Sequence, residues 1–93
     1  FNARDAFEMG LVSELAPDGE VEKRAVEMAQ QIAGLPPLAV QQIKEVVLAG
    51  QDASLDAALR LETKASQVLF SSRDQKEGMQ AFIEKRKARW EGK

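Results

Sequence analysis

The chain has 93 residues, with 13 basic and 15 acidic side chains and a net charge of −2. It contains no cysteine and no histidine, which excludes disulfides, thiolate chemistry and the commonest general base and metal ligand. No apolar run approaches the ~20 residues of a membrane span and no segment resembles a signal peptide, so we expect a cytoplasmic protein without membrane contact. This length predicts one domain, or part of one, with a modest core.

The first predicted elements are a short helix and an extended segment. Asn2 is the expected N-cap of a helix over residues 3–9, and Gly10 can supply its left-handed stop. Residues 11–15 mix apolar and polar side chains, which we interpret as a short strand that ends at Pro17. Because one short strand cannot stand alone, its sheet is expected elsewhere in a longer protein, of which this chain would be a fragment.

Three longer helices are predicted next. Asp18 is the expected start of one, and Gly34 closes it. Pro37 suits the first turn of the following helix, which ends at Gly50. Ser54 is the predicted cap of the third. The short connections predict successive helices that pack antiparallel or nearly so.

Glu62 falls inside the apolar stripe of the helix after Ser54, between Leu59 and Ala65. A carboxylate at such a position needs a partner or a water-lined gap. A structural ion pair with an arginine of a neighbouring helix is the favoured interpretation, and a functional carboxylate is the alternative.

The final helix is expected to begin at Ser71 or Ser72, because both have capping-box spacing. Apolar and long side chains at helical spacing then predict that it continues almost to the end of the chain, at Met79, Phe82, Ile83, Arg86 and Trp90. The predicted fold class is therefore all-α, with four main helices, one short N-terminal helix and one orphan strand-like segment.

No residues form a recognisable catalytic constellation. Glycine-rich phosphate loops, metal-ligand spacings and nucleophile–base pairs are absent from the sequence. Carboxylates pair at Glu20/Glu22 and at Asp74/Glu77, but all four lie in first helical turns, where acidic side chains favour capping and the helix dipole. The sequence therefore predicts no catalytic residue and no metal site.

The basic end of the chain is the best candidate for a binding site. Residues 84–93 hold five bases and two acids, while the rest of the chain is acidic. Lys85 and Arg89 fall on the edge of the predicted apolar stripe, and an apolar patch beside an ammonium suits an amphipathic anion such as a ring with a phosphate. The alternative is that these cations only stabilise a helix C-terminus. Nucleic acid is disfavoured because Trp90 is the one aromatic among the bases and the remaining surface is acidic.

Three stretches of the chain together resemble a known family: ARDAFEMGLVSELAP, IAGLPPLAVQQIKEVV and LRLETKASQVLFSSRDQKEGMQAFIEKRKARW. They are similar to the carboxyl-terminal portion of the crotonase superfamily, the enoyl-CoA hydratase/isomerase group. The most specific block runs from Asp74 through Glu77-Gly78-Met79 and Ala81-Phe82 to Glu84-Lys85-Arg86. The resemblance covers nearly the whole chain in the order of the family.

The resemblance implies a division of the chain and a role for each part. Residues 1–17 would end the catalytic core, and residues 18–93 would form the C-terminal helical oligomerisation domain of a trimer or a dimer of trimers. The parent enzyme would hydrate or isomerise an enoyl-CoA thioester of fatty acid metabolism, with acyl-CoA as substrate and no further cofactor. Phe82 matches the family's aromatic beside the CoA pocket, and Lys85 matches its lysine that meets a CoA phosphate.

The same resemblance implies that the isolated chain is inactive. The oxyanion loops and catalytic carboxylates of the family lie upstream of the part that this chain matches. An alternative is a free-standing helical protein-interaction module without catalysis, and a third, weaker one is a basic-tailed nucleic-acid binder.

Overall fold

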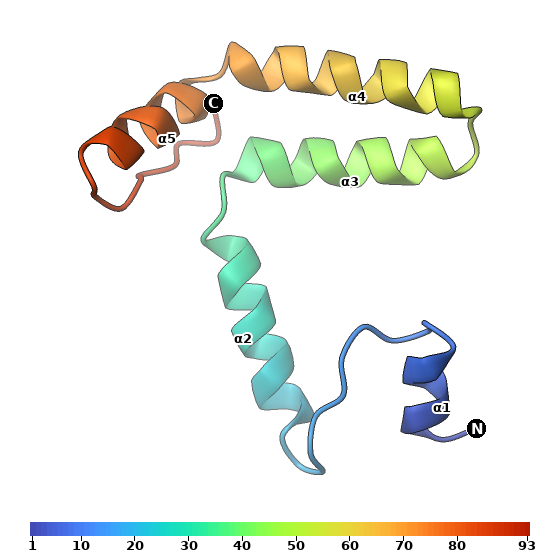
Figure 1. Cartoon of the computed structure of the whole chain (residues 1–93). Coiled ribbons are helices and arrows are strands. Elements are labelled where there is room, and N and C mark those ends of the chain that lie inside the picture. Colours follow the sequence, from blue (N-terminus) through green and yellow to red (C-terminus); the bar gives the residue numbers. More distant parts are fainter. The chain divides into compact units, whose positions relative to one another are not determined.

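The computed structural model describes residues 1–93, which form five helices and no strand. The helices are α1 (Ala3–Glu8), α2 (Val21–Ala33), α3 (Pro37–Gln51), α4 (Leu55–Phe70) and α5 (Arg73–Ile83) (Figure 1). The predicted all-α class is confirmed.

The chain divides into two compact units, residues 1–32 and 33–93, which are described separately. The boundary expected between residues 17 and 18 stays a prediction. None of the helices combines the length and the apolar character needed to cross a membrane.

In the first unit, α1 is capped as predicted but no strand follows it. Asn2 accepts a hydrogen bond from the Asp5 N–H while the Asp5 side chain accepts from the Asn2 N–H, which is a capping box. Gly10 ends the helix at φ 74°. Residues 11–17 are neither helix nor strand, because a strand exists only where a second strand pairs with its backbone groups.

The second helix begins later than predicted. Asp18 lies in a turn, closed by a 3.0 Å hydrogen bond from the Glu20 N–H to the Pro17 carbonyl, and α2 starts only at Val21. The guanidinium of Arg24 binds the carboxylate of Glu14, with 3.1 Å between Nη2 and Oε2. This hydrogen bond lowers the pKa of Glu14 and ties the extended segment to α2.

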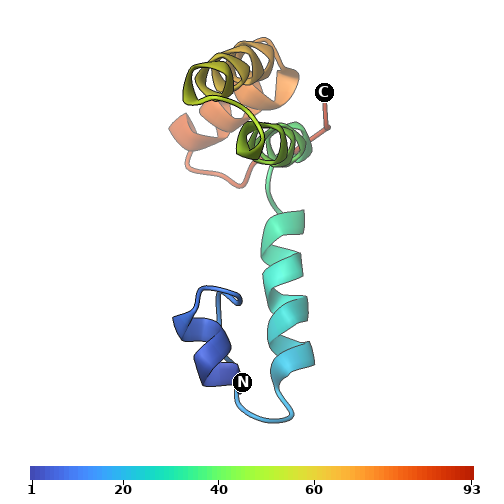
Figure 2. The same cartoon turned by 90° about the vertical axis from the view of Figure 1, so that its right-hand side faces the viewer.

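The second unit is built on an antiparallel helical hairpin of α3 and α4, as predicted (Figures 1 and 2). Pro37 opens α3, where its missing N–H costs nothing. The Ser54 hydroxyl accepts a 3.2 Å hydrogen bond from the Ala57 N–H and caps α4. Glu62 is exposed on α4 and forms no ion pair, so the expected structural ion pair is wrong: this face of α4 is open in the chain, and an exposed carboxylate needs no buried partner.

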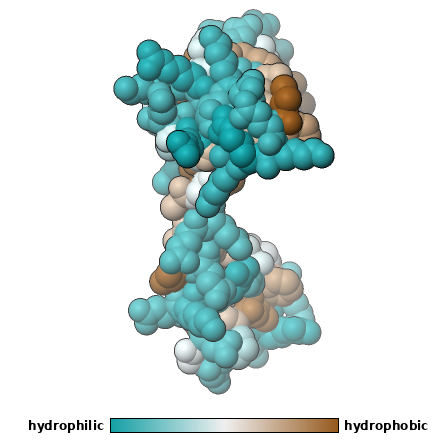
Figure 3. Space-filling view, turned by 90° about the vertical axis from the view of Figure 1, so that its left-hand side faces the viewer, coloured by the Kyte–Doolittle hydropathy of each residue, from teal (hydrophilic) through white to brown (hydrophobic).

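The chain buries very little of its apolar surface by itself. Ala6 and Ala81 are its only fully buried hydrophobic residues. Large apolar side chains remain exposed along every helix, including Phe7, Val26, Ile32, Ile43, Val47, Leu48, Leu55, Leu59, Val68, Phe70, Phe82 and Ile83. Hydrophobic atoms accordingly reach the surface among hydrophilic ones (Figure 3). Exposed apolar surface on this scale is typical of a protein that packs against further polypeptide.

Candidate functional site

The candidate site lies where α5 ends, and it ends earlier than the periodicity predicts. The Ser72 hydroxyl caps α5 by accepting a 3.1 Å hydrogen bond from the Gln75 N–H, so of the two predicted caps it is Ser72 that is used. The last helical residue is Ile83. The predicted continuation to Trp90 is therefore wrong. Arg86 and Trp90 do not extend the apolar stripe, and Arg89 does not lie on a helix edge.

A left-handed turn at Lys85 ends α5. Lys85 has φ 52° and is the only residue other than glycine with a positive φ. Its N–H donates to the Phe82 carbonyl at 3.2 Å, and the Arg86 N–H donates to the Ala81 carbonyl at 3.0 Å. These two bonds define a Schellman motif, in which the left-handed position is usually glycine.

The end of α1 shows the same motif with the expected residue. Gly10 donates to Phe7 at 3.0 Å and Leu11 donates to Ala6 at 2.9 Å, around φ 74°. A side chain at such a φ costs roughly 1–2 kcal/mol relative to the right-handed conformation. Lys85 therefore occupies an unfavourable backbone conformation that its surroundings must hold in place.

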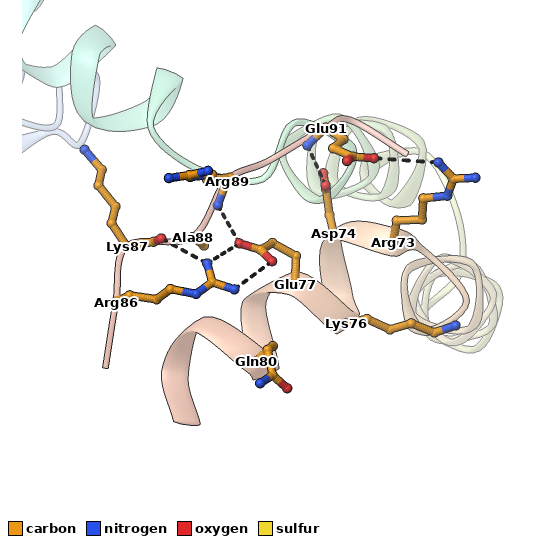
Figure 4. A pocket seen from close by; sticks show the side chains of 10 residues that line it. All are labelled: Arg73, Asp74, Lys76, Glu77, Gln80, Arg86, Lys87, Ala88, Arg89 and Glu91. Carbon is orange, nitrogen blue, oxygen red and sulfur yellow. Dashed lines mark hydrogen bonds and ion pairs between the residues drawn. The ribbon is translucent and has the colours of Figure 1, made fainter. Parts of the chain in front are cut away.

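Glu77 fastens the chain that follows this turn, residues 86–93, which we call the return segment. The Arg86 guanidinium binds both Glu77 oxygens, with Nη1–Oε1 at 2.6 Å and Nη2–Oε2 at 3.0 Å. The Arg89 N–H also donates to Oε1, at 2.8 Å (Figure 4). The hydrogen bond from Arg86, and then that from the Arg89 backbone, lower the pKa of Glu77 to about 2. Glu77 is therefore a carboxylate at neutral pH.

Asp74 fastens the far end of the same segment. Its side chain is buried, with 3% of the residue exposed. Its carboxylate accepts hydrogen bonds from the N–H of Glu91 at 2.7 Å and of Gly92 at 3.0 Å, and the Asp74 N–H donates to the Lys93 carbonyl at 3.0 Å. The first two bonds satisfy a buried carboxylate that would otherwise be costly, and the third ties the backbone of Asp74 to the end of the chain.

Trp90 lies between these two anchors and against α5. Its indole N–H donates to the Gly34 carbonyl at 2.9 Å. A Cβ atom at Gly78 would stand only 3.2 Å from Cη2 of the indole. Glycine in the middle of α5 thus makes room for the ring, although it costs about 1 kcal/mol in helix propensity relative to alanine.

The structure corrects the interpretation of Asp74 and Glu77. Both lie in the early part of α5, but their side chains bind the return segment rather than serve the helix end alone. Sequence reasoning missed this role because it treated Arg86 and Arg89 as helical. The one available signal was the pairing of acids at the start of this region with bases at its end.

The two predicted binding residues, Phe82 and Lys85, lie together at the end of α5. Phe82 is 85% exposed, and Lys85 is also exposed and directly bonded to it through the backbone. Arg86 is engaged by Glu77 and Glu84, whereas Lys85 forms no ion pair. An unpaired lysine and an exposed aromatic residue therefore both come from the C-terminal end of α5, which suits a ligand that carries both an apolar ring and an anionic group.

The family to which these residues belong follows from comparison with known proteins. The family model described as Enoyl-CoA hydratase/isomerase matches residues 1–93. The chain belongs to this family. The enoyl-CoA hydratase/isomerase resemblance predicted from the three sequence stretches is thereby confirmed.

Individual relatives of the enoyl-CoA hydratase/isomerase family agree. A probable mitochondrial enoyl-CoA hydratase of Dictyostelium discoideum is 40% identical over 91 residues, which cover 98% of this chain and 33% of that protein. A short-chain-enoyl-CoA hydratase of Clostridium acetobutylicum is 39% identical over 85 residues, which cover 91% of this chain and 33% of that protein. The chain thus spans about a third of the length of the relatives it matches.

Solved structures of the enoyl-CoA hydratase/isomerase family share the fold of the chain. The crystal structure of an enoyl-CoA hydratase from Bacillus anthracis superposes with a TM-score of 0.93 at 36% identity, covering 98% of this chain and 35% of that one. A putative enoyl-CoA hydratase/isomerase from Mycobacterium abscessus gives a TM-score of 0.95 at 32% identity, covering 100% of this chain and 38% of that one.

Proposed function

We propose that this chain is the helical C-terminal domain of an enzyme that hydrates or isomerises an enoyl-CoA thioester, and that Phe82 and Lys85 form part of its CoA-binding edge. In this proposal the domain also assembles the enzyme into a trimer or a dimer of trimers. The catalytic carboxylates and oxyanion donors belong to the preceding two thirds of the full-length enzyme.

The observation that carries the CoA-binding role is the state of Lys85. It is exposed, forms no ion pair, lies three residues after the exposed Phe82 and adopts a backbone conformation that favours glycine. A residue kept at an energetic cost where it contributes nothing visible to the fold is a candidate for function. A CoA molecule offers the matching chemistry, because it carries phosphates for the ammonium and an adenine ring for the aromatic.

Two further observations support the assembly role. The large apolar side chains of α2, α3 and α4 are exposed, and a groove between α3 and α4 is lined mainly by apolar residues such as Val46, Leu48, Leu61 and Val68. Burial of each such side chain stabilises an interface by about 1.5–3 kcal/mol. These faces suit contact with the catalytic core and with other copies of the chain.

Steady-state kinetics of a Lys85→Gln variant of the full-length enzyme test the binding role. We expect KM for crotonyl-CoA to rise about tenfold while kcat changes little, because a charge-assisted contact to a remote phosphate contributes to binding rather than to the chemical step. Lys23→Gln, which removes an exposed, unpaired lysine of α2, is the matched control and should leave KM unchanged. An unchanged KM for Lys85→Gln would reduce Lys85 to a helix-end cation.

A further inference from the structure

We propose that Glu77 is a positioning residue for the CoA-binding edge. Its carboxylate holds the return segment against α5 and thereby fixes the left-handed turn that presents Lys85. This inference rests on the proposed function, because Lys85 needs a fixed place only if it has a ligand.

The geometry around Lys85 shows why the turn depends on a neighbour. The Lys85 side chain forms no hydrogen bond or ion pair that could stabilise φ 52°. The residue directly after it, Arg86, is bound in a bidentate manner by Glu77, nine residues earlier in the chain. Arg86 also binds Glu84, the residue directly before Lys85, with 2.6 Å between Nε and Oε2. One guanidinium therefore links both neighbours of Lys85 to α5.

The pair of Glu77 and Arg86 is better suited to this role than an ordinary surface ion pair. The two side chains are 24% and 37% exposed, so solvent screens them less than a fully exposed pair. Two parallel N–H···O bonds also fix the orientation of the guanidinium. Because Oε1 additionally accepts the Arg89 N–H, the same carboxylate holds the backbone four residues beyond Lys85.

Loss of the Glu77 charge has a specific expected consequence. The Arg86 guanidinium loses its bidentate partner, the Arg89 N–H loses a charged acceptor, and the turn samples more conformations. The lysine must then be ordered when the ligand binds, which weakens binding without altering the reacting groups. The side chain of Glu77 itself need not touch the substrate.

The test compares two substrates in the full-length enzyme. For Glu77→Gln we expect KM for crotonyl-CoA to rise about fivefold with kcat nearly unchanged. KM for crotonyl-pantetheine, which lacks the nucleotide and its phosphates, should not change. The Arg89 amide should exchange its hydrogen faster in the variant, which confirms that the return segment has loosened in a folded protein. Asp56→Asn, which breaks the exposed pair of Asp56 and Arg60 on α4, is the matched control and should alter none of these quantities.

A double-mutant cycle decides whether Glu77 acts through Lys85. If it does, Glu77→Gln adds nothing to the KM of the Lys85→Gln enzyme. Additive effects, or an unchanged KM for Glu77→Gln alone, would overturn the inference. Failure of the proposed function looks different, because then Lys85→Gln alone leaves KM unchanged. Arg86→Lys, which keeps the charge and loses the bidentate geometry, should reproduce the Glu77→Gln result and serves if that variant folds poorly.

Discussion

At the scale of the residue, Lys85 and Gly10 show the same backbone motif with opposite side-chain choices. Both residues follow the C-cap of a helix and both have positive φ, with the same pair of backbone hydrogen bonds. Gly10 is the residue that the motif favours. Lys85 is not, and the proposed CoA-binding role would explain why a lysine stands where the fold favours glycine.

A Lys85→Gly variant of the full-length enzyme tests whether lysine at this position lowers stability while it aids binding. We expect the free energy of unfolding to rise by roughly 1 kcal/mol, because glycine adopts the left-handed conformation without a steric penalty. We also expect KM for crotonyl-CoA to rise as it does in Lys85→Gln. Chemical denaturation and steady-state kinetics measure the two effects. A variant that is less stable would show that lysine carries no backbone cost at this position. A variant that is equally active at low substrate concentration would show that Lys85 is not needed for binding.

At the scale of the element, α5 and the return segment form one unit. Asp74, Glu77 and Gly78 on the helix receive, in turn, the backbone at residues 91 and 92, the Arg86 guanidinium, and the Trp90 ring. The helix therefore specifies the course of the chain that follows it. The presence of glycine in a helix of strong helix formers has its explanation here.

The Gly78→Ala substitution tests this arrangement, because its effect on stability should have opposite signs with and without Trp90. In the full-length enzyme we expect a loss of about 1 kcal/mol in stability, because the new methyl group meets the rigid indole 3.2 Å away and overpacking outweighs the gain in helix propensity. In a Trp90→Leu background the same substitution should instead stabilise, since the clash is gone. Thermal unfolding of the four proteins measures both signs. A stabilising effect with Trp90 present would show that the ring moves away at no cost.

The sequence predicts the helices well and the return segment poorly, for a physical reason. Capping by Asn2, Ser54 and Ser72 depends on side chains a few residues away, and local spacing reveals it. The reversal after Ile83 depends instead on contacts between residues up to 56 positions apart, as in the bond from Trp90 to Gly34. Residues 86 and 90 happen to keep helical spacing, so periodicity alone could not detect the break. Phe82 and Lys85 stay predictions that the basic end of the chain and the family resemblance suggest, whereas the contacts of Glu77 became visible only in the fold.

At the scale of the whole molecule, the dominant feature is the apolar surface that the chain leaves uncovered. Two alanines are its only fully buried hydrophobic residues. A domain of this size normally depends on a buried apolar core for its stability. We therefore expect contacts with further polypeptide to contribute much of the stability of the chain.

The isolated 93-residue chain should accordingly self-associate and lack turnover. We expect sedimentation velocity to show species larger than a monomer that increase with concentration, because exposed apolar faces associate in water. We also expect no hydration of crotonyl-CoA, since the chain contains no catalytic constellation. A clean monomer at high concentration would contradict the assembly role. Measurable hydration would contradict the placement of the catalytic groups outside this chain.

The exposed apolar faces also bear on how the cell handles newly made copies. An unassembled subunit exposes apolar segments of the kind that chaperones and quality-control proteases bind in unfolded chains. Orphan subunits should then be cleared faster than assembled ones. Under the proposed assembly role, the cellular supply of the assembled protein would depend on how quickly its subunits meet as well as on how fast they are synthesised.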